Sequence, residues 1–463
     1  MRLLACCALF VALGCTPLRR SFVCASDDAC VQGDVRGTCE ASGACSFPDA
    51  SCAASGRRYA PLSPGGLGGQ CVVPPCGGID QACCATGPAC ASPKLTCTSG
   101  VCAGCVAQLV AGGAHACALT TDGQARCWGA NDHGQLGSGD LADSVAPRAV
   151  VDASGVALTE IVELSAGESH TCAVRRDGTL LCWGDGEDGQ LGTGPGMTGA
   201  ANPTPTLVGL TTVAQVAAGG RHTCAALADG RAYCFGANDA GQLGQAGAGA
   251  TAPEPVTLAG AAQLTTATAL AAGDAFTCAL DKNGGRLCFG ANDSGQLGDG
   301  TTLAKSIATP IAGTALALAA GGALLCLLDE NHTPRCSGAN AFGQTGQPPS
   351  PSVLTPMAVA GAAGIATLAV GRDHACARRD DGVVLCWGND DLGQLGDGKS
   401  EARSTAQPIE ATAPMGTLAA GRGFACAATA EGVSCWGDDR RGQLGDGLTT
   451  SRGTPAPSLL SCP

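Results

Sequence analysis

One phrase recurs seven times between residues 109 and 444, and it restricts the chain to a repeat fold. The first copy reads GGAHACAL, then DG, then CWG, then GQLG, and ends at Gly137. Its leading cysteine, Cys117, returns at intervals of about fifty residues, at Cys172, Cys224, Cys278, Cys326, Cys376 and Cys426. Such a period, with several turn signals in each copy, is typical of small units that bury a shared core by stacking.

Each copy also predicts a hairpin in which two cysteines face each other. In the first copy, Thr121-Asp122-Gly123 suits a three-residue loop with Gly123 in the left-handed conformation. Counting outward places Cys117 opposite Cys127, where a disulfide fits, although small buried hydrophobic residues are the other interpretation. The predicted pairs are Cys117 with Cys127, Cys172 with Cys182, Cys224 with Cys234, Cys278 with Cys288, Cys326 with Cys336, Cys376 with Cys386, and Cys426 with Cys435.

The combined motifs GxxHxCAL, DGxxxCWG and NDxGQLG resemble the repeat of the regulator of chromosome condensation family. Cysteine stands where that family usually has a small or apolar residue. Seven copies imply a mainly β fold, a seven-bladed β-propeller whose blades are small antiparallel sheets. The fifth copy departs from the pattern at Leu324, Ser337 and Thr345, but its glycines and cysteines keep the frame, so we expect a blade there too.

The amino terminus predicts export. Met1-Arg2 precedes an apolar run from Leu3 to Leu13, and Gly14-Cys15 follows. This order resembles a bacterial lipoprotein signal, which implies a lipid on Cys15 and, with Thr16 next, sorting to the outer membrane or cell surface. An ordinary secretory signal, with Cys15 as a disulfide partner, is the other interpretation.

The cysteine count agrees with an oxidising compartment. Setting aside Cys6, Cys7 and Cys15 leaves an even number of the 31 cysteines. The expected order is a signal peptide (1–14), a tether (15–23), a cysteine-rich module (24–52), a flexible linker (53–70), a second cysteine-rich module (71–104) and the propeller (105–462).

Aligning the last copy on the second one brings the two ends of the propeller together. Cys105 then corresponds to Thr212 and Cys462 to Leu210. We therefore expect the chain ends to meet within one blade and to be joined by a Cys105–Cys462 disulfide.

No residue pattern indicates a catalytic, cofactor or metal site. Histidine precedes the cysteine in four copies, but Phe276, Leu324 and Phe424 replace it elsewhere, which favours packing over metal ligation. The tryptophans sit at one repeat position, which favours packing between blades over an exposed platform. The acids Asp185, Glu187, Asp188, Asp390 and Asp391 lack the order of a calcium loop, and we interpret them as solvated turns.

The net charge of −13 argues against a nucleic-acid partner. We expect a monomeric, surface-anchored protein whose propeller presents loops to a protein or polysaccharide. In the resembled family, members act as exchange factors for a small GTPase or, in an exported bacterial case, as β-lactamase inhibitors; the signal excludes the first role. Inhibition of a secreted enzyme, or a propeller lyase or hydrolase acting on polysaccharide, are the alternatives. We expect a binding rim in the longest variable segments, Ser138–Glu160, Thr193–Gln215 and Gln245–Thr268.

Overall fold

The computed structural model describes residues 105–195, 201–411 and 414–461, together with the backbone of seven short strands before them. It divides into two compact units, Met1–Pro75 and Cys76–Pro463. The short strands form three small sheets, β1-β2, β3-β4-β5 and β6-β7. Their bounds are β1 (Val31–Gln32), β2 (Val35–Arg36), β3 (Thr38–Cys39), β4 (Cys45–Pro48), β5 (Arg57–Tyr59), β6 (Thr96–Thr98) and β7 (Val101–Ala103).

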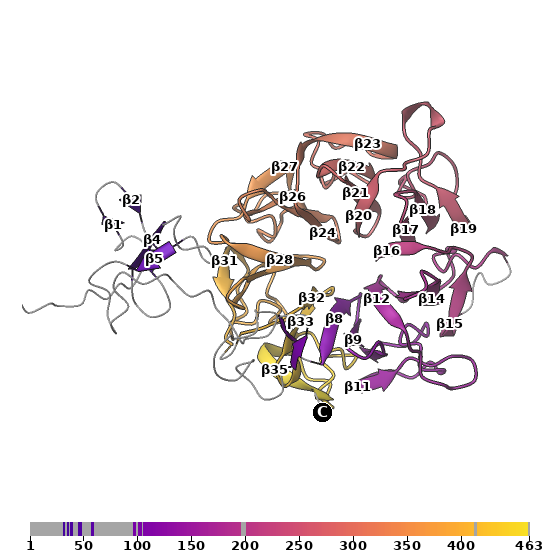
Figure 1. Ribbon diagram of the computed structural model, residues 1–463, viewed down its shortest axis with the longest axis horizontal. Helices are drawn as coiled ribbons and strands as arrows, with labels where there is room; N and C mark the ends of the chain where they lie inside the picture. Colours follow the sequence, from indigo (N-terminus) through magenta and orange to yellow (C-terminus); the bar gives the residue numbers. More distant parts are fainter. Residues whose placement is uncertain are drawn as a thin grey trace, which may run out of the picture. The chain divides into compact units, whose positions relative to one another are not determined.

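The repeats form seven four-stranded antiparallel sheets arranged in a ring (Figure 1). The fold is therefore mainly β and a seven-bladed propeller, as the sequence predicted. The strands of the first four blades are β8 (Val106–Ala111), β9 (His115–Thr120), β10 (Ala125–Gly129) and β11 (Ser144–Ala149); β12 (Ile161–Ala166), β13 (His170–Arg175), β14 (Leu180–Gly184) and β15 (Asn202–Val208); β16 (Val213–Ala218), β17 (His222–Leu227), β18 (Ala232–Gly236) and β19 (Ala250–Pro255); and β20 (Ala267–Ala272), β21 (Phe276–Asp281), β22 (Gly285–Gly290) and β23 (Lys305–Thr314).

A 3-10 turn, η4 (Ala259–Ala261), follows the third blade. The strands of the last three blades are β24 (Ala317–Gly321), β25 (Leu324–Leu328), β26 (Pro334–Ala339) and β27 (Ser352–Ala358); β28 (Ile365–Val370), β29 (His374–Arg379), β30 (Val384–Gly388) and β31 (Arg403–Pro408); and β32 (Leu418–Ala420), β33 (Phe424–Thr429), β34 (Gly432–Gly437) and β35 (Arg452–Ser461).

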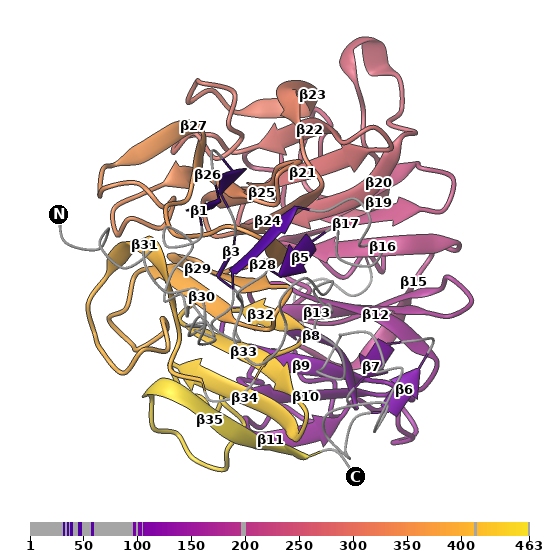
Figure 2. The same ribbon diagram turned by 60° about the vertical axis from the view of Figure 1, so that its left-hand side comes forward.

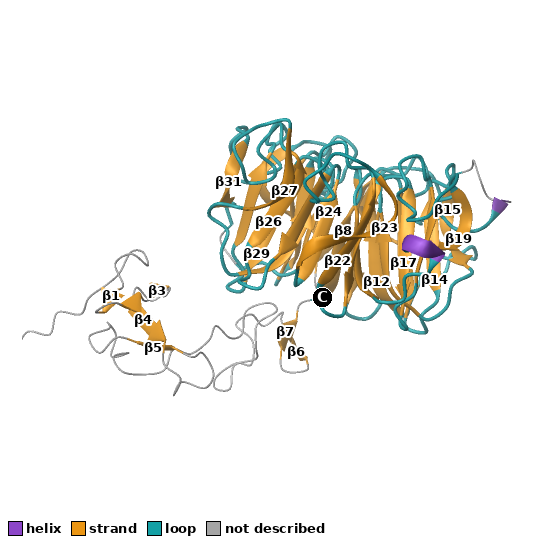
Figure 3. Cartoon of the chain, turned by 90° about the horizontal axis from the view of Figure 1, so that it is seen from above, coloured by secondary structure: helices purple, strands orange, loops and turns teal. Residues whose placement is uncertain are grey.

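The strands run through the thickness of the ring, so the loops gather on two faces (Figure 3). We call one the turn face; it carries the turns between the first and second strands, such as 112–114, and the loops between the third and fourth, such as 130–143. We call the other the hairpin face; it carries the loops between the second and third strands and the connectors between blades, such as 150–160. Consecutive antiparallel strands dictate this alternation.

The outermost strand of every blade contains proline. Such edge strands expose unpaired backbone groups that could recruit other strands, and proline removes a donor there. The prolines are Pro147, Pro203, Pro205, Pro253, Pro255, Pro310, Pro356, Pro408, Pro455 and Pro457. The propeller edge is thus protected against sheet extension.

The cysteines pair across the central hairpin of each blade. In the first blade the N–H of Thr120 donates to the carbonyl of Gln124 at 2.9 Å, and Gly123 has a φ of 81°, as expected for the three-residue loop. Alternation from that bonded pair puts Cys117 and Cys127 at a non-hydrogen-bonded position, with a Cα separation of 4.1 Å.

All seven cysteine pairs predicted from the repeats are disulfides, and each has the same Cα separation of 4.1 Å. The interpretation of these cysteines as free buried hydrophobic residues is therefore wrong. The bonds join Cys117 to Cys127, Cys172 to Cys182, Cys224 to Cys234, Cys278 to Cys288, Cys326 to Cys336, Cys376 to Cys386, and Cys426 to Cys435. The last pair has a sequence separation of 9 instead of 10, yet the two residues still face each other across β33 and β34.

The expectation that both chain ends lie within one blade is wrong. β8 belongs to the first blade and β35 to the last, and each sheet is built only from its own consecutive strands. The reason is the phase of the repeat: it begins with an innermost strand and ends with an outermost one, so each copy is a complete blade. The first and last blades instead pack side by side, with β35 beside β11 (Figures 1 and 2).

A hydrogen bond from tryptophan joins neighbouring blades. The indole N–H of Trp183 donates to the Gln135 carbonyl of the GQLG turn in the preceding blade at 3.0 Å, and Trp387 and Trp436 do the same. Trp128 closes the ring with the same bond to Gln443, at 2.9 Å. The four indoles are fully buried, which confirms packing rather than an exposed platform.

Other residues fill the aromatic position in the remaining blades. Phe235 and Phe289 pack on the last glycine of the preceding GQLG turn, where a Cβ would come within 3.0 Å of the ring. In the fifth blade the small Ser337 does not fill the space of an aromatic ring. The ring of Pro356 packs there instead, 3.0 Å from where a Cβ of Gly298, the equivalent glycine of the preceding blade, would lie. The fifth copy therefore forms a blade despite its altered sequence.

The buried histidines also join blades. His115 Nε2 lies 2.9 Å from Thr171 Oγ1 of the next blade, and that hydroxyl donates to the Gln135 carbonyl. Because the hydroxyl has one proton and gives it to the carbonyl, the imidazole donates from Nε2. His170 and His222 repeat this arrangement with the next blade's threonine. The histidines are structural, as the sequence predicted.

Burial lowers the pKa of these three histidines and of the fourth one, His374. The pKa falls to about 4 for His115 and His374 and to about 3 for His170 and His222. His374 differs in its neighbour, because Ala425 occupies the position of the threonine.

We predict that Trp128→Ala destabilises the propeller as much as Trp183→Ala, by ~3–5 kcal/mol, because both indoles fill equivalent buried joints. Urea unfolding of the two variants measures this. A loss for Trp128→Ala of less than a third of that for Trp183→Ala would show that the first and last blades are not joined like the others.

We predict that His374→Phe flattens the acid side of the stability profile. A histidine that is neutral when folded but protonated when unfolded contributes stability that is lost as pH falls from about 6.5 toward 4. The variant should therefore gain roughly 3 kcal/mol on the wild type between pH 7 and pH 4. Urea midpoints across that range test it, and parallel profiles would contradict the assignment.

Candidate interaction face

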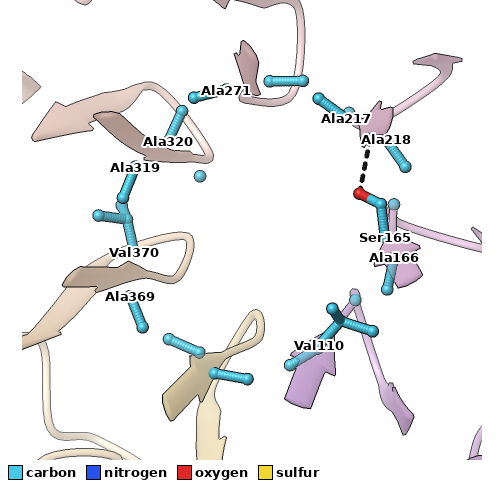
Figure 4. A pocket seen from close by; sticks show the side chains of 18 of the residues that line it. Val110, Ser165, Ala166, Ala217, Ala218, Ala271, Ala319, Ala320, Ala369 and Val370 are labelled. Carbon is cyan, nitrogen blue, oxygen red and sulfur yellow. Dashed lines mark hydrogen bonds between the residues drawn. The ribbon is translucent and has the colours of Figure 1, made fainter. Parts of the chain in front are cut away.

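The first strand of every blade lines a central channel of about 330 Å³. Its wall consists largely of small side chains, among them Ala166, Ala218, Ala271, Ala320 and Val370 (Figure 4). The N–H of Ala218 in the third blade donates to the hydroxyl of Ser165 in the second blade at 2.9 Å. Small residues are needed here because seven strands converge on the axis.

Charged side chains ring the channel where it opens on the turn face. The four residues each follow the glycine that comes directly after an inner strand: Glu168, Asp274, Arg372 and Arg422. Arg422 of the last blade reaches Glu168 of the second blade at 3.0 Å. This bridge passes over the first blade because Gly113 has no side chain there; a Cβ would lie 2.7 Å from the Glu168 carboxyl carbon.

Two further arginines connect blades on the turn face. Arg441 of the last blade donates to Asp143 of the first at 2.8 Å, and this hydrogen bond holds the pKa of Asp143 below its usual value. Arg221 contacts Asp188 and Asp239, each at 3.0 Å. The pairs are partly exposed and contribute little stability, so their main effect is on the charge pattern that a partner meets.

The turn face also exposes apolar side chains. Leu141, Leu303 and Leu448 lie in the third-to-fourth-strand loops of the first, fourth and last blades and are 49%, 67% and 49% exposed. Leucine side chains beside paired charges suit protein recognition better than sugar recognition. No sequence signal distinguished them, because exposure is set by loop geometry.

An asparagine organises most of these loops. Asn131 accepts the N–H of Leu136 at 2.9 Å, and its amide donates to the carbonyls of Asp140 and Ala142. The other asparagines that act alike are Asn238, Asn292 and Asn340.

In the last two blades Asp390 and Asp439 replace the asparagine. The interpretation of Asp390 as part of a solvated turn is wrong, because its side chain is fully buried at the position that asparagine occupies in the other blades. Its neighbour Asp391 is exposed, as expected.

The expected single rim of long loops is not present. The additional residues of the first and third segments lie in 150–160 and 256–266, on the hairpin face. The second segment is long between β14 and β15 instead, where residues 196–200 lie outside the described residues. The hairpin-face segments fold back on themselves and bury Leu158 and Leu264 in the cores between blades. Trimming them would therefore cost stability, so they are not only surface loops available for binding.

The other cysteines predicted as sites lie partly outside the described residues. Cys105 is disulfide-bonded and packs against the core between the last and first blades, while Cys462 lies outside the described residues. Cys15 and the modules also lie outside them, apart from the short strands. In the described part of the chain, no group of three or more metal-ligating side chains comes together, and no helix is long and apolar enough to cross a membrane.

Family models identify the repeats. A model described as "Regulator of chromosome condensation (RCC1) repeat" matches residues 106–135, 161–190, 213–242, 267–296 and 365–394, and a second of that description matches 122–174, 177–226 and 229–280. Human "Probable E3 ubiquitin-protein ligase HERC6" is 34% identical over 41% of this chain and 19% of its own length. "Ultraviolet-B receptor UVR8" of Arabidopsis thaliana is 37% identical over 30% of this chain and 31% of its own.

Solved structures show the same fold. Yeast RCC1 (Prp20), solved with Kap60, superposes with a TM-score of 0.64 at 20% identity, covering 73% of this chain and 84% of that one. Human WBSCR16 gives 0.60 at 18% identity, over 68% and 84%. The chain thus carries regulator of chromosome condensation repeats, folded as a seven-bladed β-propeller whose blades are each stapled by a disulfide.

Proposed function

We propose that the protein is a surface-anchored binding protein, held to the cell envelope by a lipid on Cys15, and that the turn face of its propeller binds another protein. The observation that carries this proposal is the rigid ring itself. Seven cross-strand disulfides and buried joints fix the positions of the turn-face loops, and a fixed surface loses little conformational entropy on binding.

The chemistry of the turn face supports a protein partner. Three exposed leucines supply apolar area, and the arginine–carboxylate pairs of the turn face supply oriented charge. The net charge of −13 favours a partner with a basic contact surface.

The comparisons support interaction rather than a specific activity. One solved yeast structure is described together with its binding properties to Gsp1p and histones, and that binding belongs to that protein. The chain spans less than a third of the length of HERC6 and UVR8, so ligase activity and light reception are not carried over.

We predict that Leu141→Ser, Leu303→Ser and Leu448→Ser together abolish capture of a specific envelope protein by the full-length chain while leaving the urea midpoint unchanged. Quantitative pull-down from the native envelope measures capture. The matched control is Val156→Ser with Leu316→Ser, which removes exposed apolar side chains from the hairpin face.

Capture that survives the turn-face variant but fails in the control would move the site to the other face. Binding on a glycan array, without protein capture, would replace the protein partner with a polysaccharide. Hydrolysis or elimination of a bound glycan would point to the enzyme alternative.

The anchor is tested separately. We predict that the wild-type protein partitions into the detergent phase of a Triton X-114 extraction and that Cys15→Ser moves it to the aqueous phase, because a lipid supplies the apolar area. Aqueous partitioning of the wild type would eliminate the tether and leave the turn-face proposal standing.

A further inference from the structure

At three places in the propeller a carboxylic acid stands where other blades have an amide. Asp390 and Asp439 replace the loop-organising asparagine, and Glu163 replaces a glutamine that joins inner strands. An amide both donates and accepts hydrogen bonds, whereas an ionised carboxylate only accepts. An ionised carboxylate at such a position therefore cannot make the hydrogen bonds that the amide nitrogen donates in the other blades.

The fourth blade shows what the amide does in the loop. Asn292 accepts the N–H of Leu297 at 3.0 Å through its oxygen. Its nitrogen donates to the Asp299 carboxylate and the Thr301 carbonyl, both at 3.0 Å, and to the Leu303 carbonyl at 3.2 Å. The pocket for this nitrogen is therefore lined by acceptors.

Asp390 and Asp439 keep only the accepting half of this pattern. Oδ1 of Asp390 accepts the N–H of Leu395 at 2.8 Å, and Oδ1 of Asp439 accepts that of Leu444 at 2.9 Å. Both side chains are fully buried, and Oδ2 of each makes no hydrogen bond of normal distance and angle, although the backbone N–H of Glu401 or Thr450 approaches the carboxylate. These oxygens occupy the position of the donating nitrogen.

Charged groups surround the two aspartates unevenly. Asp397, at the position of Asp299, faces Asp390, and Arg403 and Lys399 pair with Asp397. Around Asp439 the corresponding groups are Asp446, paired with Arg452 at 2.8 Å, and the buried Asp438, paired with the exposed Arg440. Around Asp439 the two arginines balance Asp446 and Asp438, so one negative charge remains, and one proton neutralises it. Around Asp390 the two cations, Arg403 and the exposed Lys399, equal the two carboxylates in number, so the need for a proton there comes from the burial of Oδ2 and not from the net charge.

Glu163 joins the second and third blades. At the equivalent position Gln108 donates to the Leu164 carbonyl at 3.1 Å and accepts the Leu164 N–H at 2.8 Å, and Gln215 does the same with Leu270. Glu163 accepts the N–H of Val216 at 3.4 Å, and as a carboxylate it has no proton to give in return. A protonated carboxyl restores the missing donor.

We propose that Glu163, Asp390 and Asp439 each hold a proton in the folded propeller at mildly acidic pH, and that losing these protons loosens the joint between the second and third blades and the turn-face loops of the last two. The propeller thus contains a pH-sensitive element that acts on the face proposed for binding, although it stands without that function.

The electrostatics agree with this geometry. Burial raises the pKa of Glu163 to about 7, and no charged side chain contributes to that shift. Burial raises the pKa of Asp390 and Asp439 to about 6, and it outweighs the hydrogen bond from the backbone N–H of Leu395 or Leu444, which lowers the pKa. The facing Asp397 or Asp446 carboxylate raises the pKa further, against the lowering effects of Arg403 or Arg452 and of the backbone N–H of Glu401 or Thr450. A divalent cation could also neutralise the aspartates, but it would lie beside a guanidinium, which disfavours it.

The sign of the pH effect follows from these values. An acid whose pKa is higher in the folded state contributes stability below its unfolded pKa, near 4, and that stability is lost as pH rises through 6 to 7. The buried histidines act in the opposite direction over part of the same range. The effect must therefore be read from the difference between two variants in which the histidines cancel.

The experiment compares the wild-type full-length chain with Glu163→Gln/Asp390→Asn/Asp439→Asn, which installs the amides of the other blades. Urea midpoints and Tm are measured from pH 4.5 to 8. The profiles should coincide near pH 4.5 and separate as pH rises, with the variant several degrees more stable at pH 8. Near pH 5.5 the slopes should differ by up to about three protons.

A control variant removes the same charge from exposed turn-face positions, Glu187→Gln/Asp293→Asn/Asp391→Asn. It should shift the curve without this slope. A constant difference between the amide variant and the wild type across pH would overturn the proposal. Stabilisation of the wild type, but not of the amide variant, by calcium chloride over EDTA at pH 8 would also overturn it, in favour of a cation site.

Discussion

The structure depends on the joint between neighbouring blades. A single four-stranded sheet cannot bury both of its faces, and the hydrophobic cores lie between blades, each drawing residues from two of them. At most joints an aromatic side chain meets a GQLG turn, and the indole N–H gives the bond its direction. Because the joints are alike, the last blade meets the first without exchanging a strand.

Departures from the repeat are matched across these joints. Histidine occurs in three blades where the next blade offers a threonine hydroxyl, and Phe276 faces a blade that offers Leu325 instead. Where Ser337 replaces the aromatic residue, Pro356 occupies the space about Gly298. The disulfides therefore hold together the two central strands of each blade, whereas the contacts between blades hold the blades together in a ring.

The two faces of the ring differ in which of their loop residues are buried and which are exposed. The hairpin-face segments that look like free insertions bury Leu158 and Leu264, so part of the variable sequence belongs to the core. The turn face combines exposed leucines with ion pairs that connect blades, and two of its loops are organised by buried acids instead of amides. Recognition and sensitivity to pH would thus share one face of the ring.

The sequence by itself determined the number of blades, the central hairpin of each and its cysteine pairing, because a fifty-residue period and a loop with a left-handed glycine are local signals. It also indicated that the histidines pack, since Phe and Leu replace them in other copies, and that the tryptophans pack, since all four sit at one repeat position. Tertiary structure alone decided how the ring closes, which residues of the long segments are buried, and that Asp390 is buried while Asp391 next to it is exposed. The physical reason is that these properties depend on the neighbouring blade, whose contacts come from residues about fifty positions away or, at the closure, from the opposite end of the propeller.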